Sequence, residues 1–202
     1  MKEAVVPYIP GPTDWSRIPV LDIPESVRPS DAQVTARAQI CYDDDALKLH
    51  LSATEHQIRR EEHGPLGLPY QDSCLEFFIC PMDGDLRYFN FEFSASGCLL
   101  LGFGSMEYRF RQVPSEEQKQ ELFAPVIQMR PDGWDLYFQI PCDFIRQYFP
   151  DFQAVSGKTV RANFYKCGDL TPKPHYLAWN MITRKGMHLF HTPAEFGRLV
   201  FE

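Results

Sequence analysis

A set of polar and aromatic side chains lies on one face of the predicted β-strands, and their chemistry suits a polyhydroxylated ligand. Within each strand these residues are spaced two apart, which places them on the same face because side chains alternate along a strand. Carboxylate and amide groups bind sugar hydroxyls through paired donor and acceptor bonds, and aromatic rings pack on the C–H faces of sugars. The same pattern is also typical of the solvated face of a β-sandwich, so the spacing leaves both interpretations open. The set comprises Glu76, Tyr88, Asn90, Glu92, Arg161, Asn163 and Tyr165.

Two of these residues, Glu76 and Glu92, could instead form the carboxylate pair of a glycoside-processing enzyme. The sequence contains no G-x-S-x-G, H-E-x-x-H or phosphate-loop motif. The segment Gly102-Phe103-Gly104 lacks the third glycine of a dinucleotide fingerprint. We therefore expect a protein without catalytic activity, and we keep the glycoside-processing enzyme as an alternative.

Histidine and methionine residues near the C-terminus allow a second alternative, a haem-binding domain. His188 and His191 could bind a metal ion, and Met181 and Met187 could supply an axial ligand to haem. The spacing of these residues matches no metal motif, and methionine is most often a packing residue. We therefore expect no metal site and no cofactor, with haem restricted to this alternative.

Hydrophobic and polar residues alternate with a period of two through most of the chain, which predicts β-strands. Clear examples are the segments 34–42, 47–52 and 159–165, and the segments 114–122 and 143–149 could be short helices. About ten strands with one or two short helices, and no strand–helix–strand alternation, predict an all-β fold. The expected architecture is an antiparallel β-sandwich of immunoglobulin-like or jelly-roll-like type.

Composition limits the classes of partner. The 202 residues are 44% hydrophobic and 23% charged, as in ordinary folded domains, and the net charge of −7 argues against nucleic acid as a partner. No apolar run approaches the roughly 20 residues of a membrane helix, so we expect no membrane partner. The first residues, MKEAVVPYIPGP, lack a signal-peptide core. We expect a cytoplasmic protein unless a leader has been removed, and the sequence does not predict the oligomeric state.

Two regions of the chain differ in composition. Residues 1–32 contain six prolines and predict an extended arm that packs on the domain formed by residues 33–202. The six cysteines form no C-x-x-C pair, and a chain of this size has core enough without disulfides. We expect the cysteines to be buried free thiols.

Over roughly residues 33–202 the chain resembles the family 9 carbohydrate-binding modules. The likeness is carried by PYQDSCLEFFICP, YFNFEFSASGCLLLGFG, RANFYKCGD and YLAWNMI…FHTPAEFGRLVFE. The D-S-x-x-E-x-F-I strand and the F-H-x-P-x-x-F-G-x-L terminus are the more specific pieces. The chain looks most like the "carbohydrate-binding family 9-like" proteins, a branch of the superfamily that also contains DOMON-type sugar- and haem-binding domains.

The resemblance implies a non-catalytic β-sandwich in which two aromatic rings clamp a terminal, typically reducing-end, sugar. Tyr70 matches the first aromatic position, where tryptophan is usual, and Trp179 best matches the second. Glu76 matches the family glutamate. The family's Arg-x-Asn pair falls on Tyr88 and Asn90, so that the asparagine is kept and the arginine is not.

The remaining implied ligand contacts come from the strand that precedes Trp179. Asn163 and Lys166, with Arg161 close by, match amide and basic groups of the family. From this set we expect a mono- or oligosaccharide to bind with a dissociation constant of order micromolar to millimolar. A slot that has lost binding, because tyrosine replaces tryptophan and the arginine is missing, is a further alternative.

Several modules of this family hold a structural calcium ion, so the resemblance also makes calcium an option here. The acidic turns at 43–45 or at Asp83 and Asp85 could supply the oxygen ligands. Acidic turns usually need no ion, and neither spacing is diagnostic.

Overall fold

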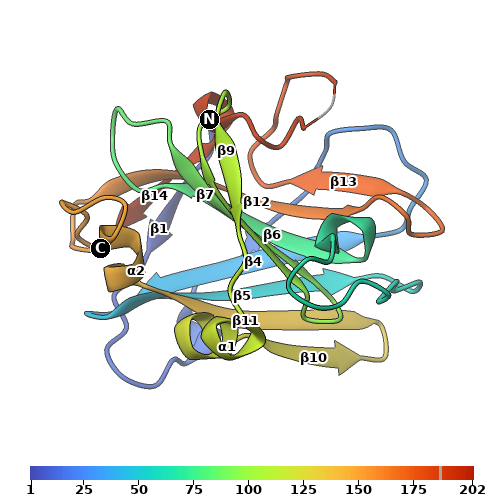
Figure 1. Ribbon diagram of the computed structural model, residues 1–202, viewed down its shortest axis with the longest axis horizontal. Helices are drawn as coiled ribbons and strands as arrows, with labels where there is room; N and C mark the ends of the chain where they lie inside the picture. The colour runs from blue at the N-terminus through green and yellow to red at the C-terminus, as the bar shows by residue number, and fades with distance from the viewer. Residues whose placement is uncertain (187) are drawn as a thin grey trace.

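Two β-sheets pack face to face in the computed structural model, which describes residues 1–186 and 188–202 (Figure 1). The strands of the larger sheet follow the order β1-β14-β12-β6-β7-β8-β9. They are β1 (Glu3–Val6), β14 (Gly197–Phe201), β12 (Thr159–Gly168), β6 (Cys74–Cys80), β7 (Tyr88–Ser94), β8 (Leu99–Gly104) and β9 (Arg109–Gln112), with β13 (His175–Ala178) pairing β12 and β3 (Glu25–Ser26) pairing β13. All of these pairs are antiparallel except β1 with β14.

The smaller sheet is wholly antiparallel and has the order β10-β11-β5-β4-β2. Its strands are β10 (Val126–Arg130), β11 (Gly133–Pro141), β5 (Ala46–Thr54), β4 (Thr35–Tyr42) and β2 (Leu21–Asp22). The helices are short: α1 (Glu116–Phe123), α2 (Cys142–Arg146), and the 3-10 turns η1 (Trp15–Arg17), η2 (Pro69–Gln71) and η3 (Pro193–Glu195). The predicted antiparallel β-sandwich is confirmed, with more strands than the ten or so expected.

The core lies between the sheets and is built from the alternating apolar residues of both. Phe77, Phe91 and Phe164 of the larger sheet face Leu49 and Leu136 of the smaller one, and all of them are fully buried in one cluster. Burial of this continuous apolar layer is the main source of stability for such a fold. A second cluster lies on the opposite face of the larger sheet, around Phe78, Tyr88 and Tyr165. This face is therefore covered rather than solvated, and it carries the polar residues singled out above.

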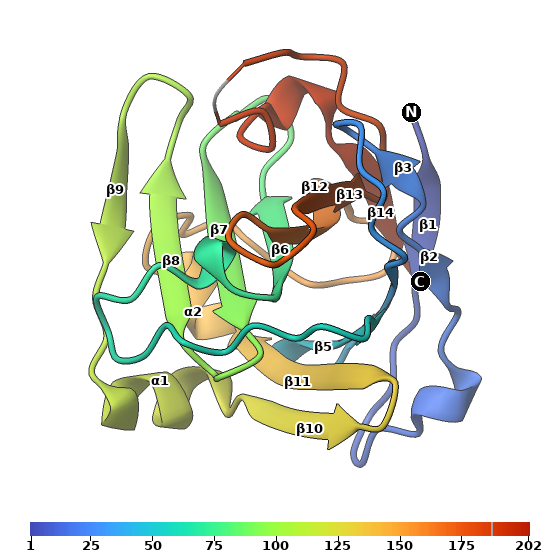
Figure 2. The same ribbon diagram turned by 90° about the vertical axis from the view of Figure 1, so that its right-hand side faces the viewer.

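The proline-rich residues 1–32 contribute strands to both sheets. In this region β1 pairs with β14, β2 pairs with β4, and β3 pairs with β13. Figure 2 shows these strands along one side of the molecule, with β9 at the other side. None of the helices among the described residues has the length and apolar character of a membrane span. The six cysteines are all buried and free, as expected.

Candidate ligand-binding site

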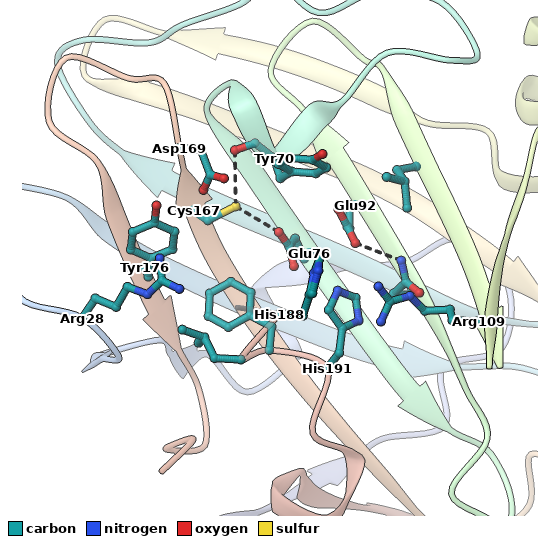
Figure 3. Close-up of a pocket in the computed structure, with 14 residues that line it drawn as sticks. Arg28, Tyr70, Glu76, Glu92, Arg109, Cys167, Asp169, Tyr176, His188 and His191 are labelled. Atoms are coloured by element: carbon teal, nitrogen blue, oxygen red, sulfur yellow. Dashed lines mark hydrogen bonds between the residues drawn. The ribbon is translucent and has the colours of Figure 1, made fainter. Parts of the chain in front are cut away.

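A cavity of about 450 Å³ opens on the face of the larger sheet that points away from the smaller sheet (Figure 3). Its volume lies within the usual range for small-molecule sites. Strands β6, β7 and β12 supply its floor, while η2, β13, β9 and the loop before η3 supply its walls. The lining residues are Arg28, Tyr70, Glu76, Asn90, Glu92, Leu100, Arg109, Cys167, Asp169, Tyr176, His188, Leu189, Phe190 and His191.

Two glutamates occupy the floor of this pocket. Glu76 on β6 pairs in register with Glu92 on β7, and their exposed fractions are only 2% and 4%. Neither carboxylate forms a salt bridge within the described part of the chain. Burial raises the pKa of Glu92 to about 7, against the opposing effects of Arg109 and Asn90. Burial, with the neighbouring Cys167 and Glu92, raises the pKa of Glu76 well above its usual value.

Two thiols flank Glu76. Cys167 on β12 is directly opposite Cys74 on β6, and its thiol donates to Oε1 of Glu76 at 3.0 Å. Burial raises the pKa of Cys74 to about 12, and the hydrogen bond with Cys74 together with burial raises the pKa of Cys167. One sulfur or oxygen atom from each of the three residues lies within 4.8 Å of the others. Within the described structure, these three residues bring two sulfur atoms and one carboxylate oxygen close enough together to coordinate one metal ion.

Asn90 is held between Glu92 and β8. Its Nδ2 donates to Oε1 of Glu92 at 2.9 Å, whereas its Oδ1 is buried without a hydrogen-bond donor in the described structure. A Cβ atom at Gly102 would lie 2.2 Å from that Oδ1. The glycine therefore leaves the space that the carboxamide of Asn90 fills.

Tyr88 supports the wall of the pocket from beneath. Its hydroxyl accepts a hydrogen bond from Nη1 of Arg109 at 3.0 Å and lies 2.9 Å from Nδ1 of His191. Burial and the charge of Arg109 lower the pKa of His191 to about 2, so the imidazole is neutral. The Tyr88 hydroxyl therefore joins Arg109 and His191, two residues that line the pocket.

The rings that face the pocket come from a loop and from the short strand β13. Tyr70 lies on η2 at one side of the pocket, and Tyr176 on β13 lies at another. The guanidinium of Arg28 stacks on Tyr176, 4.7 Å from its ring centroid. Phe190 stacks on Tyr165 with ring centroids 4.0 Å apart and so fills the space between the sheet and the C-terminal loop.

Trp179, predicted as the second clamp ring, does not line the pocket. Its exposed fraction is 3%, and its indole packs on Phe164 in the core between the sheets. A Cβ atom at Gly197 would lie 2.4 Å from the indole, so the glycine provides its space. Strand β13 ends at Ala178, and along it Tyr176 faces the pocket while the indole falls on the other face. This corrects the prediction: the tryptophan is a core residue.

Lys166, predicted to contact ligand, also points away from the pocket. Its Nζ is fully buried and lies 3.0 Å from Oε1 of Glu55 and 2.8 Å from Nε2 of His175. The neighbouring Cys167 faces the pocket, so alternation along β12 directs the lysine to the opposite side. Glu55 also accepts from the indole of Trp134 at 2.7 Å, which makes this a buried structural network. The prediction of a ligand contact is therefore corrected for Lys166 as well.

Asn163 and Arg161 lie on the expected face of β12 but do not line the pocket. The Nδ2 of Asn163 donates to Tyr165 and to the carbonyl of Asn180, and its Oδ1 accepts from the backbone amides of Phe164 and Asn180. The carboxamide of Asn163 therefore hydrogen-bonds the backbone of Asn180, which follows β13, to the larger sheet. Nη1 of Arg161 donates to the carbonyl of Ala194 at 3.4 Å. Both residues serve the fold next to the site.

Of the residues predicted to contact ligand, the structure gathers Tyr70, Glu76 and Asn90 at the cavity, together with Glu92 of the predicted polar face, and places Tyr88 directly behind it. Several lining residues were not predicted from the sequence: some come from loops or from short outer strands, and Leu100 and Cys167 come from β8 and β12 within the sheet. The full set is Arg28, Leu100, Arg109, Cys167, Asp169, Tyr176, Leu189 and Phe190. The alternation of 175–178 contained a usable signal, since it puts Tyr176 and Trp179 on opposite faces.

Of the residues named for haem, His188 and His191 line the pocket. Met181 is 41% exposed and does not line the pocket, and Met187 lies outside the described residues. In the two acidic turns, Asp43 pairs with Lys48 and Asp85 pairs with Arg87. Each turn thus already has a cationic partner.

The sandwich and its pocket define a class of sugar-binding module, and comparison with known proteins gives the family. Residues 27–201 match the family model described as carbohydrate-binding family 9, and the chain belongs to that family. A search of curated proteins gives no match.

Solved structures show the same fold over the whole chain. A protein from Bacteroides uniformis for which carbohydrate binding has been proposed is 27% identical, with a TM-score of 0.85 over 100% of this chain and 99% of that chain. A family 9 carbohydrate-binding module from Caldicellulosiruptor kristjanssonii, in complex with glucose, is 14% identical, with a TM-score of 0.68 over 100% and 96%. A further structure from that organism, in complex with cellotriose, is 14% identical, with a TM-score of 0.65 over 100% and 94%.

Proposed function

We propose that the pocket binds a terminal sugar of a mono- or oligosaccharide without catalysing a reaction. The observation that carries this proposal is the combination of aromatic rings and buried carboxylates around one cavity in a family 9 chain. Tyr70 offers a ring for the C–H face of the sugar. Tyr176, on which the Arg28 guanidinium stacks, is the second aromatic ring of the proposed clamp, the role that was predicted for Trp179. The volume of about 450 Å³ suits a small ligand better than a long stretch of polysaccharide.

The polar groups of the pocket complement sugar hydroxyls, each of which can donate and accept. Glu76, Glu92 and Asp169 provide acceptors, while the guanidinium of Arg109 provides donors. Hydrogen bonds to a charged group such as the Arg109 guanidinium are the stronger ones, and the walls of the pocket shield them from water. The two Caldicellulosiruptor structures contain glucose and cellotriose, which makes glucose and its β-linked oligomers the first ligands to test.

The pair of Glu76 and Glu92 favours one second candidate, a glycoside-processing enzyme. Residues directly opposite in an antiparallel pair have Cβ atoms about 4.5–5.5 Å apart, and retaining glycosidases hold their carboxyl groups at about 5–5.5 Å. A nucleophile must be ionised, however, and burial favours the neutral form of both glutamates. Chromogenic glycosides test this candidate: release above background by the wild type, lost in Glu76→Gln, would establish an enzyme.

Isothermal titration with glucose, cellobiose and xylo-oligosaccharides tests the proposed binding. We expect a dissociation constant of order micromolar to millimolar for at least one of them, and a loss of about tenfold or more in Tyr70→Ala, given about 0.5–1.5 kcal/mol for a ring contact beyond its buried area. Tyr108→Ala is the matched control, because Tyr108 is 80% exposed and lies outside the pocket. No heat with any sugar, or equal affinity in Tyr70→Ala, would refute the proposal.

A further inference from the structure

We propose that Cys74, Glu76 and Cys167 form a binding site for one thiophilic divalent metal ion of the zinc class. Each residue offers one ligand atom, and the two sulfurs and the carboxylate oxygen lie within 4.8 Å of one another. The site lies at the floor of the pocket, and the inference does not depend on sugar binding. It assigns a role to the two buried thiols of Cys74 and Cys167, which the proposed sugar contacts do not use.

The sheet itself brings the three residues together. Cys74 and Glu76 are two residues apart on β6, so their side chains share a face, and Cys167 is the register partner of Cys74 on β12. Both strands are central in the larger sheet, which fixes the backbone beneath all three side chains. Zn–S bonds of about 2.3 Å in a tetrahedron put sulfurs about 3.8 Å apart. The observed separation of 3.0 Å between Cys167 Sγ and Glu76 Oε1 needs only a small side-chain adjustment to admit an ion.

Charge at the site points to a cation. Glu76 is buried, forms no ion pair among the residues that the structure describes, and faces a second buried carboxylate, Glu92. A buried carboxylate without a positive partner is costly, and a divalent ion would supply that partner. On binding, the two thiols and the carboxyl group of Glu76 would lose their protons to solvent, and the ion would accept both thiolate sulfurs and one carboxylate oxygen.

The donor set selects the type of ion. Calcium and magnesium prefer shells made of oxygen, whereas thiolates select softer ions such as zinc. Three protein ligands leave a tetrahedral ion one open position. Glu76 and Cys167 both line the cavity, so that position faces the pocket, where water or a ligand hydroxyl could fill it.

The test uses the full chain, kept reduced with a non-thiol reductant and free of sugar. Titration with Co²⁺ should give one equivalent of binding with a thiolate-to-cobalt charge-transfer band in the near ultraviolet, and Zn²⁺ should abolish that band. The variants Cys74→Ser and Cys167→Ser should each weaken binding at least tenfold. Cys80→Ser is the matched control, because Cys80 is another buried cysteine on the same face of β6 outside the cluster, and it should bind like the wild type.

A second measurement on the wild type avoids reliance on variants that could fail to fold. X-ray absorption of the zinc-loaded protein should show two sulfur neighbours at about 2.3 Å together with oxygen neighbours at about 2.0–2.2 Å. An absence of Co²⁺ binding, a shell of oxygen and nitrogen alone, or full binding by folded Cys74→Ser/Cys167→Ser would overturn the inference. Because sugar titration in metal-free protein is a separate experiment, a failure of one proposal is distinguishable from a failure of the other.

Discussion

Glu76 and Glu92 lie directly opposite each other on two neighbouring central strands, and both are almost completely withdrawn from solvent. Two facing carboxyl groups that form no salt bridge in the described structure do not favour stability, since burial opposes their ionisation. The fold keeps them at the floor of a cavity that contains both aromatic rings and donors. This arrangement is what separates a binding site from the solvated face of a sandwich.

The first prediction concerns the dependence of stability on pH. The pKa of Glu92 is about 7 in the folded protein against 4.5 in the reference state, so the folded state binds more protons between these values. The protonated Glu92 side chain therefore adds to the free energy of unfolding fully below about pH 4.5. This addition is lost as the pH rises through 7, which lowers the free energy of unfolding by up to about 3 kcal/mol. We expect Glu92→Gln to be more stable than the wild type at pH 8 and little changed at pH 4.5.

Urea denaturation at both pH values measures this difference. Glu107→Gln provides the control, because Glu107 is an exposed glutamate outside the pocket. Parallel stability profiles for the wild type and Glu92→Gln would show that the buried carboxylate is not the source of the slope.

The second prediction concerns the buried network around Lys166. Burial and the charge of Lys166 lower the pKa of His175 to about 4, below its reference value of 6.5. The unfolded state then binds more protons between these values, so stability is lost as the pH falls from 6.5 to 4, by up to about 3 kcal/mol. Thermal unfolding of His175→Gln should show a shallower loss over this range, whereas a slope equal to that of the wild type would contradict the assignment.

The third prediction separates the core tryptophan from the pocket tyrosine. Trp179→Ala should lower the free energy of unfolding by about 3–5 kcal/mol, because it removes a large buried ring. The milder Trp179→Phe should fold and bind sugar with the affinity of the wild type. Denaturation and sugar titration of the two variants test this. A large loss of sugar affinity in folded Trp179→Phe would show that the indole contributes to sugar binding.

The fourth prediction concerns the close approach of Gly102 to Asn90. In Gly102→Ala the new Cβ would collide with the Asn90 carboxamide, so we expect a loss of about 1–3 kcal/mol in stability and weaker sugar binding. In an Asn90→Ala background the same glycine substitution should cost less stability. A double-mutant cycle measures the coupling, and additive effects would exclude the contact.

Much of the fold was predictable because alternation along a strand is a local property. The segments around 76, 90 and 163 alternate strictly, so the face that carries Glu76 and Asn90 follows from the sequence alone. Which side of the sandwich such a face occupies depends on apolar content, and the Phe-rich strands identified the core side correctly.

The remainder of the site depends on register and tertiary position. Lys166 and Trp179 were assigned to the pocket from the family resemblance, whereas Cys167 and Tyr176 line it. For Lys166 the difference is a single position along β12, and one position moves a side chain to the other face of the sheet. Arg109 belongs to the edge strand β9, more than thirty residues from Glu76 along the chain, and only pairing through β7 and β8 brings it to the cavity. No local pattern encodes that approach.

A crystal structure of the protein with glucose or cellobiose would show whether sugar binds over the Glu76–Glu92 floor beside Tyr70. We expect one sugar ring packed on Tyr70, with hydroxyls hydrogen-bonded to Glu76 or Glu92 and with the indole of Trp179 still buried in the core. A sugar bound elsewhere on the molecule, with this pocket free of ligand, would contradict this expectation.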